Sequence, residues 1–406
     1  MFSGLLVATD IPDHPSLSKY DEWVYLDYVD KVGRLDIPQR GEFIDREALA
    51  VSSCRGVFVW GPMGSSCGGP YTSAEYPMAG VTSADIHPPT YFAANAAIAR
   101  SVRIVGLSGD ILTSNRMVGA LWLFLGLGLL VMLAMDLGAP LWSAVGAAGV
   151  IAALPIIRDT NSYITPDALN VAIGAAVLLT AVRYARGVWP WWALVAIGAL
   201  AGAIKTQNGL AVGAAAVFLT WCAVSSHGAK GRVTRQMWGA AGMVGGFLVT
   251  QVGWLVVRSL IAVGDRPDQG VAVPLTFDLM TKESMAFVLR LGLGELTPVP
   301  TFAVLSTAVL IAGCIGALFY RRVADEAWGM AAAVTLLVFI GSPILLVAEY
   351  VGLGEVVPSP TRYGASLLAG IGAVTATAFP TRVRSAGFAA VGTGMVALVV
   401  VDALVN

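Results

Sequence analysis

The chain has 406 residues, of which 56% are hydrophobic and only 13% are charged. Soluble proteins carry about twice that share of charge, and one of this length could not bury so much apolar surface. Most of the chain is therefore expected to lie in lipid. The 25 basic and 26 acidic residues nearly cancel, which excludes the positive field that nucleic-acid binding needs.

The charged residues are concentrated near the N-terminus. Residues 9–116 hold 13 of the 26 acidic and 9 of the 25 basic residues, so this stretch is predicted to be a polar domain. Residues 1–8 are too short for a span or a signal peptide, and we interpret them as the end of a truncated first transmembrane helix. A short amphipathic start on an export-competent bundle is the alternative.

From residue 117 onward, apolar runs recur that are long enough to cross a bilayer core of about 30 Å. The predicted fold is an all-α, polytopic transmembrane bundle over residues 117–406, with a further loop at about 264–300. The predicted spans are residues 117–135, 139–157, 166–184, 189–204, 208–224, 238–263, 301–320, 327–347, 363–379 and 386–404.

The basic residues between these spans predict an orientation. Nine lie on one side if the spans alternate, namely Arg183, Arg186, Lys230, Arg232, Arg235, Arg321, Arg322, Arg382 and Arg384. The short loops on the other side hold only Arg158, Lys205 and Arg362. Because basic residues favour cytoplasmic loops, the polar domain and the loop at 264–300 are predicted to lie outside the cytoplasm. An oxidising compartment permits a disulfide between Cys54 and Cys67.

Asp21 and Glu22 open the polar domain just before a predicted amphipathic helix. The apolar residues of segment 22–32 recur at helical spacing, at Trp23, Leu26, Val29 and Val32. The helix is therefore expected to lie on the bilayer surface, with Asp21 at its N-terminus near the membrane plane. Simple helix capping by Asp21 and a first-turn Glu22 is the alternative.

Two further acidic residues flank the next predicted outside loop. Asp159 ends one span and Asp167, after Pro166, begins the next. Ionisable groups at this depth are costly unless they face water or a partner. Capping of a helix that begins at Pro166 explains Asp167, whereas Asp159 has no such role and is a functional candidate.

The motif His87-Pro88-Pro89-Thr90-Tyr91 precedes an apolar-rich stretch. The two prolines fix an extended approach and then allow a helix to begin. His87 is a candidate proton shuttle, with a hydrogen-bonded structural histidine as the alternative. No second His or Cys stands at metal-ligand spacing, so a zinc site is not predicted.

Two basic residues remain at the predicted outer face. Lys205 opens a polar turn between two apolar runs, and Arg362 opens a span directly after Pro360 and Thr361. Either base can bind a phosphate, Arg through paired hydrogen bonds and Lys as a point charge. Snorkelling of these long side chains to the interface is the alternative.

Together these motifs resemble the GT-C superfamily of polytopic glycosyltransferases, in particular bacterial members similar to protein mannosyltransferases and aminoarabinose transferases. The residues that carry the resemblance are Asp21-Glu22, His87-Pro88-Pro89-Thr90-Tyr91, Arg116, Pro166-Asp167-Ala168-Leu169-Asn170, Lys205-Thr206-Gln207 and Arg362-Tyr363. The resemblance implies a polyprenyl-phosphate-linked sugar as donor, an extracytoplasmic glycan, lipid or protein as acceptor, and an active site at the outer face of the bacterial inner membrane.

The same resemblance implies roles for individual residues. Asp21 would be the general base. Glu22 and Asp159 would orient substrate hydroxyls or hold a divalent cation, if one is used, and Lys205 and Arg362 would stabilise the departing lipid phosphate. The remaining substrate-binding candidates are His87, Tyr91, Asp167, Gln207 and Tyr363.

Two other classes of protein remain open. A secondary transporter suits many spans and few charges, but transporters concentrate ionisable residues and broken helices at the bilayer midplane. A non-catalytic scaffold or degenerate transferase is the second alternative. The acids of this chain lie instead at the outer ends of spans and in the long polar stretch, which favours surface chemistry over transport. Convergence of Arg158, Asp159, Lys205 and Arg362 beside Asp21 would argue against the scaffold.

Overall fold

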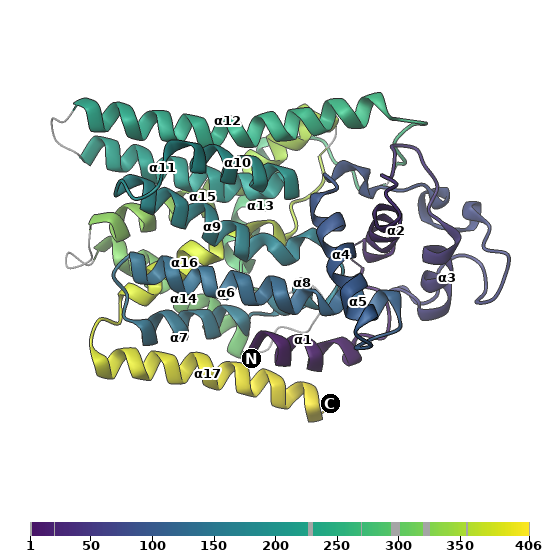
Figure 1. The fold of residues 1–406 in the computed structure, drawn as a ribbon, viewed down its shortest axis with the longest axis horizontal. Coiled ribbons are helices and arrows are strands. Elements are labelled where there is room, and N and C mark those ends of the chain that lie inside the picture. The colour runs from purple at the N-terminus through teal and green to yellow at the C-terminus, as the bar shows by residue number, and fades with distance from the viewer. Residues whose placement is uncertain are drawn as a thin grey trace.

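A computed structural model describes residues 2–19, 21–225, 230–268, 270–293, 301–319, 325–354 and 356–405. Within these ranges the regular elements are helices, and β-structure is limited to isolated bridges. Long helices lie side by side in a bundle, and a compact loop domain formed by the N-terminal part of the chain caps one end of it (Figure 1).

The loop domain is built from short helices. They are α1 (Phe2–Asp13), which runs into the domain from the bundle, α2 (Glu22–Gly33), α3 (Arg46–Arg55), η1 (Ser73–Glu75), η2 (Pro77–Gly80), η3 (Ala84–Ile86), α4 (Thr90–Ile104) and α5 (Ile111–Met117). Helix α2 is buried along most of its length, and this includes Lys31, whose Nζ lies 3.1 Å from Asp27 and 2.8 Å from Glu42. The apolar spacing of α2 predicted a helix lying on the bilayer surface. The structure instead buries α2 inside the loop domain, where acidic side chains pair with Lys31.

The bundle contains the remaining elements. They are α6 (Gly119–Asp136), α7 (Leu141–Ala152), α8 (Pro155–Ser162), η4 (Pro166–Leu169), α9 (Asn170–Ala185), α10 (Trp191–Ile204), η5 (Thr206–Asn208), α11 (Gly209–Ser225), α12 (Lys230–Leu260), α13 (Phe277–Arg290), α14 (Thr301–Phe319), α15 (Asp325–Leu353), η6 (Thr361–Gly364), α16 (Ala365–Thr377) and α17 (Arg382–Val405). Each of the ten predicted spans overlaps at least one of these helices, and the span at 139–157 overlaps both α7 and α8. Residue 320 and residues 294–300 of the predicted loop lie outside the described ranges, and α13 occupies part of that loop.

Length and composition identify candidate membrane-spanning helices. Among the described residues, six helical segments are long and apolar enough to cross a membrane, or up to seven if the bent pair α7–α8 forms one span. Helix α10 and residues Val304–Phe319 of α14 are shorter apolar helices. The protein is accordingly an integral membrane protein with an all-helical, polytopic fold.

One predicted boundary is corrected by the structure. The span at 139–157 ends with α7, and Pro155 starts α8 at an angle of 68° to α7. Proline has no N–H to donate within a helix and is favoured in a first turn, so it ends one helix and begins the next. Arg158 and Asp159 consequently lie inside buried α8 and not in an exposed loop.

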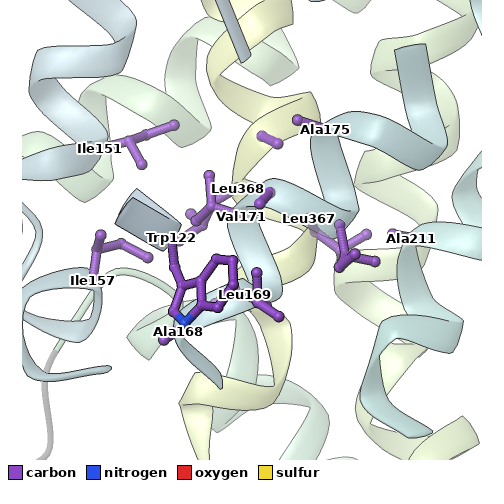
Figure 2. Close-up of a cluster of buried hydrophobic side chains, with 14 of the residues drawn as sticks. Trp122, Ile151, Ile157, Ala168, Leu169, Val171, Ala175, Ala211, Leu367 and Leu368 are labelled. Atoms are coloured by element: carbon purple, nitrogen blue, oxygen red, sulfur yellow. The ribbon is translucent and has the colours of Figure 1, made fainter. Parts of the chain in front are cut away.

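Helices α9 and α16 form the centre of the bundle, and both are almost entirely buried. They cross so closely that a Cβ on Gly174 would lie 1.9 Å from the backbone oxygen of Ser366. Such close approach is typical of small residues between transmembrane helices. Figure 2 shows part of the buried apolar cluster, with Val171 of α9 and Leu367 and Leu368 of α16 together with Trp122, Ile151 and Ile157 of other helices.

A disulfide joins Cys54, near the end of α3, to Cys67 in the loop that follows. We expect the Cys54→Ser/Cys67→Ser variant to lose up to about 3 kcal/mol of loop-domain stability, because the bridge limits the freedom of the unfolded loop. Thermal unfolding with and without reductant measures the loss, with Cys222→Ala as the control because Cys222 is outside the bridge. Free thiols at both positions in the purified protein would contradict the bridge.

Candidate active site

Three helices begin at the loop-domain end of the bundle, each after a 3-10 turn. Turn η4 precedes α9, η5 precedes α11 and η6 precedes α16. Proline stands at the start of η4 and just before η6, where its fixed φ suits a helix entry. Helix N-termini carry unpaired N–H groups and a partial positive charge, so the meeting of three of them favours an anion.

Asp167 lies at the centre of this end of the bundle. Its Oδ1 is 2.6 Å from Lys205 Nζ, and its Oδ2 is 3.2 Å from Arg362 Nε. Asn170 Nδ2 donates to Asp167 Oδ1 at 2.9 Å, and all four side chains are buried. Asp167 thus lies between two buried cations, Lys205 and Arg362, which are the groups of this cluster that can attract an anionic ligand.

Two more predicted residues lie beside this cluster. The ring of Tyr363 faces both cations, with Lys205 Nζ 4.7 Å and Arg362 Cζ 5.4 Å from its centre. Gln207 is 7% exposed, and its Oε1 finds no hydrogen-bond partner in the described part of the chain. A buried amide oxygen without a partner is costly, so it is suited to accept a hydrogen bond from a ligand hydroxyl.

Asp21 lies close enough to this cluster to respond to its charges. Burial raises the pKa of the Asp21 carboxyl above its ordinary value, while Arg362 and Lys205 lower it and Asp167 raises it further. Asp21 also has a left-handed backbone conformation, with φ of 61°, which is uncommon for residues other than glycine. Strained backbone of this kind clusters at functional sites, and here it occurs at a carboxylate on which both predicted phosphate-binding cations act.

Tyr25 is a site residue that the sequence analysis did not identify. It follows Asp21 by one helical turn, and its hydroxyl lies 3.1 Å from His87 Nε2. Burial lowers the pKa of His87 to about 3, and Lys205 contributes to the shift. His87 is therefore neutral at physiological pH and can fix the position of the Tyr25 hydroxyl. In the sequence, the spacing of Tyr25 one helical turn after Asp21 could have indicated that the two side chains lie on the same side of the helix.

Glu22 has a different environment from its neighbour Asp21. Arg116 donates to both of its oxygens, through Nε at 2.8 Å and Nη2 at 2.7 Å. The backbone N–H groups of Ser18 and Ile164 donate to the same carboxylate at 2.7 and 2.9 Å. With four donors on two fully buried oxygens, Glu22 joins the loop domain to the bundle and has little capacity left for a substrate.

We expect Glu22→Gln to lower stability and Asp21→Asn to leave it unchanged. An amide at position 22 removes a charge that Arg116 needs and places an N–H donor against other donors, a change that costs about 3–5 kcal/mol for a buried pair. Thermal unfolding of the two variants in the same detergent gives the comparison. Equal unfolding temperatures for Glu22→Gln and the unaltered protein would contradict the structural role.

The remaining predicted acids and aromatics lie at the edge of the cluster or away from it. The hydroxyl of Tyr91 accepts a hydrogen bond from Thr165 N at 3.2 Å, two residues before Asp167. Asp159 is buried in α8, and its charge acts on Tyr163, as do the charges of Glu22 and Arg116. Asp159 thus belongs to the surroundings of the Glu22–Arg116 pair.

Two ion pairs that the sequence analysis did not predict connect the loop domain to the bundle near the site. Arg158, predicted to line the outside loop, pairs with Asp10 of α1. Arg258 near the end of α12 donates to Asp85 at 2.5 Å, and Trp254 donates to the carbonyl of Ile86 at 3.2 Å. The second contact holds the segment before His87 against the bundle. Partners 148 and 173 residues apart leave no local sequence signal.

Among the described residues, no group of three or more His, Cys, Asp or Glu side chains is arranged to hold a metal ion. Asp21 and Asp167 are each accompanied by the same two cations. Lys205 and Arg362 are thus the two cations that act on both carboxylates of the site.

The comparisons with known proteins agree with this architecture. No family model matches the chain, and none of the curated proteins matches it. The fold is nevertheless similar to that of a solved membrane protein. ArnT from Cupriavidus metallidurans, in a structure bound to undecaprenyl phosphate, is 15% identical to this chain with a TM-score of 0.53. The alignment covers 98% of this chain and 63% of the ArnT chain.

Proposed function

We propose that this protein transfers a sugar from a polyprenyl phosphate to an acceptor at the extracytoplasmic face of the bacterial inner membrane. The observation that carries the proposal is the convergence of Asp21 with Lys205 and Arg362 at the loop-domain end of the bundle. The ArnT structure contains undecaprenyl phosphate, and the fold and the two buried cations suit a ligand of that chemistry.

The reaction would need two kinds of group, and the site supplies both. Asp21 accepts the proton of an acceptor hydroxyl while the hydroxyl oxygen forms a bond to the anomeric carbon of the sugar. The bond between that carbon and the phosphate oxygen breaks, and its electron pair leaves with the lipid phosphate. Lys205, Arg362 and the three helix N-termini stabilise the negative charge that develops there.

The surroundings of Asp21 suit the role of base. A carboxylate is a weak base, so positioning against the acceptor has to provide much of the rate enhancement. Burial raises the pKa of Asp21, which moves its basicity toward the physiological range. The neighbouring Tyr25 hydroxyl, held by His87, is placed to orient a sugar or acceptor hydroxyl.

Reconstitution tests the proposal directly. The purified protein in liposomes is supplied with a panel of polyprenyl-phosphate sugars and extracted envelope acceptors, with and without a divalent cation chelator. Release of sugar from one lipid donor is the expected result, and the chelator arm measures whether a divalent cation takes part. Absence of release from every donor, by protein that binds polyprenyl phosphate and remains folded, would favour the scaffold alternative.

The rate of transfer is expected to fall with decreasing pH earlier than for an ordinary aspartate base. Because burial raises the pKa of Asp21, its carboxylate is protonated and inactive at pH values where a typical Asp is still charged. His87, whose pKa is lowered to about 3, contributes no ionisation near pH 6.5. A profile of kcat against pH checks both statements, and an inflection near 6.5 that disappears in His87→Gln would contradict the second.

A further inference from the structure

A groove separate from the proposed active site runs along the loop domain. It lies between the C-terminal half of α2, the length of α4 and the face of α5, and it encloses about 730 Å³. Its apolar lining includes Val29, Val32, Ala96, Ala97 and Ile111. The site residues Asp21 and Tyr91 lie at the other ends of α2 and α4, so the groove is a distinct feature of the same two helices.

Large apolar side chains stand exposed at one end of this groove. Leu35, just beyond α2, is 96% exposed, and Ile104, at the end of α4, is 76% exposed. Both line the groove, and Val105 and Leu107 next to them are also largely exposed. An apolar patch continuous with a groove marks a surface that another apolar body covers.

The position of this apolar patch in the chain indicates which apolar partner covers it. Helix α5 supplies Ile111 and Asn115 to the groove, and Ile111 is also the first residue of the candidate membrane span Ile111–Asp136. Leu107 precedes that span by only four residues. Helix α5 leads directly into the apolar part of this span, so it connects the groove to the segment that is expected to enter the bilayer. Lipid chains are the most abundant apolar partner there.

The charged residues that line the groove favour a negatively charged lipid headgroup. Arg34, Arg100 and Arg103 line it, against the single acid Asp30. Arg34 is paired with Asp30 at 3.1 Å, and Arg103 Nη1 donates to Ser114 Oγ at 2.9 Å. Arg100 is exposed, and no carboxylate or hydrogen-bond partner for it occurs in the described ranges. Its guanidinium is available for a phosphate, which it binds through paired hydrogen bonds.

We propose that this groove binds an anionic phospholipid of the surrounding bilayer, with its phosphate on Arg100 and an acyl chain along the apolar floor. The bound lipid would fill the space between α2 and α4, and would cover Leu35 and Ile104. This inference does not depend on the proposed transferase activity, because it concerns a lipid that is neither donor nor acceptor and is tested by binding alone.

The test uses the full chain in nanodiscs with equal amounts of phosphatidylglycerol and phosphatidylcholine. Native mass spectrometry after release counts the lipids that stay bound. We expect preferential retention of phosphatidylglycerol by the unaltered protein and a loss of about tenfold in Arg100→Gln, because one charge-assisted contact is removed. Arg46→Gln, an exposed arginine of α3 that does not line the groove, is the charge-matched control and should retain the preference.

A second variant tests the apolar part of the groove. Ala97 is exposed on its wall, so Ala97→Trp should fill the space and release the lipid without removing any charge. Equal retention of the two lipids by the unaltered protein would overturn the proposal. Identical behaviour of Arg100→Gln and Arg46→Gln would overturn it as well, as would selective capture of an acidic peptide in place of lipid.

Discussion

Asp21→Asn is expected to reduce sugar release from the lipid donor by about 10²–10⁴-fold, the range that a positioned general base contributes. The amide keeps the size of the side chain but cannot take a proton from the acceptor. Its surroundings contain two cations and Asp167, so the substitution removes one charge from a site that retains others. Folding should persist, and the measurement is initial rate in liposomes at saturating donor.

The control for this prediction is Asp36→Asn, which changes an exposed acid of the same domain. That variant should retain the full rate. Full activity in Asp21→Asn would remove the assignment of the base, even if the protein is a transferase. Equal loss in both variants would show that the charge of the whole domain, and not the proton acceptor, controls the rate.

Replacement of Arg362 should weaken both catalysis and donor binding. In Arg362→Gln the developing phosphate charge loses one of its two buried cations, and we expect kcat to fall by about 10²–10³-fold, as for loss of one preorganised donor. The same change leaves Asp167 with Lys205 alone, so some loss of stability is expected too. The unfolding temperature is therefore measured alongside the rate.

Arg362→Lys separates charge from geometry. Lysine restores the positive charge but not the planar fork of donors, so we expect stability to return and the rate to recover only in part. Arg384→Gln, an exposed arginine of α17, is the charge-matched control for a general effect of removing a base. Affinity for polyprenyl phosphate that is unchanged in Arg362→Gln would contradict the assignment of this residue to the phosphate.

The sequence predicted the helices better than their contacts. Ten apolar runs each correspond to a helix because lipid requires a continuous apolar surface and internal backbone hydrogen bonds. The break at Pro155 was visible in the sequence, but only the packing shows that it places Asp159 inside buried α8. Periodicity gave the extent of α2 and not its burial, since Lys31 is hidden by acids from a later loop.

The candidate site was predictable only through the resemblance to a known superfamily. No spacing along the chain relates Asp21 to Lys205 or Arg362, which come from widely separated segments. Tyr25 had a signal, since it follows Asp21 by one turn of helix. The adjacent acids Asp21 and Glu22 look alike in sequence, and only the structure distinguishes them. Two cations act on Asp21, whereas Glu22 accepts hydrogen bonds from four donors.

The linkage through Glu22 also restricts how substrates reach the site. Arg116 is bound to the carbonyl oxygens of His14 and Ser16 as well as to Glu22, and Glu22 in turn accepts from Ile164 beyond α8. Of these bonds, the one from Ile164 joins the loop domain to the bundle, and the pairs Arg158–Asp10 and Arg258–Asp85 join them too. A hinge movement that swung the loop domain away would break all three contacts, so substrate entry is expected to use smaller displacements of side chains or helices.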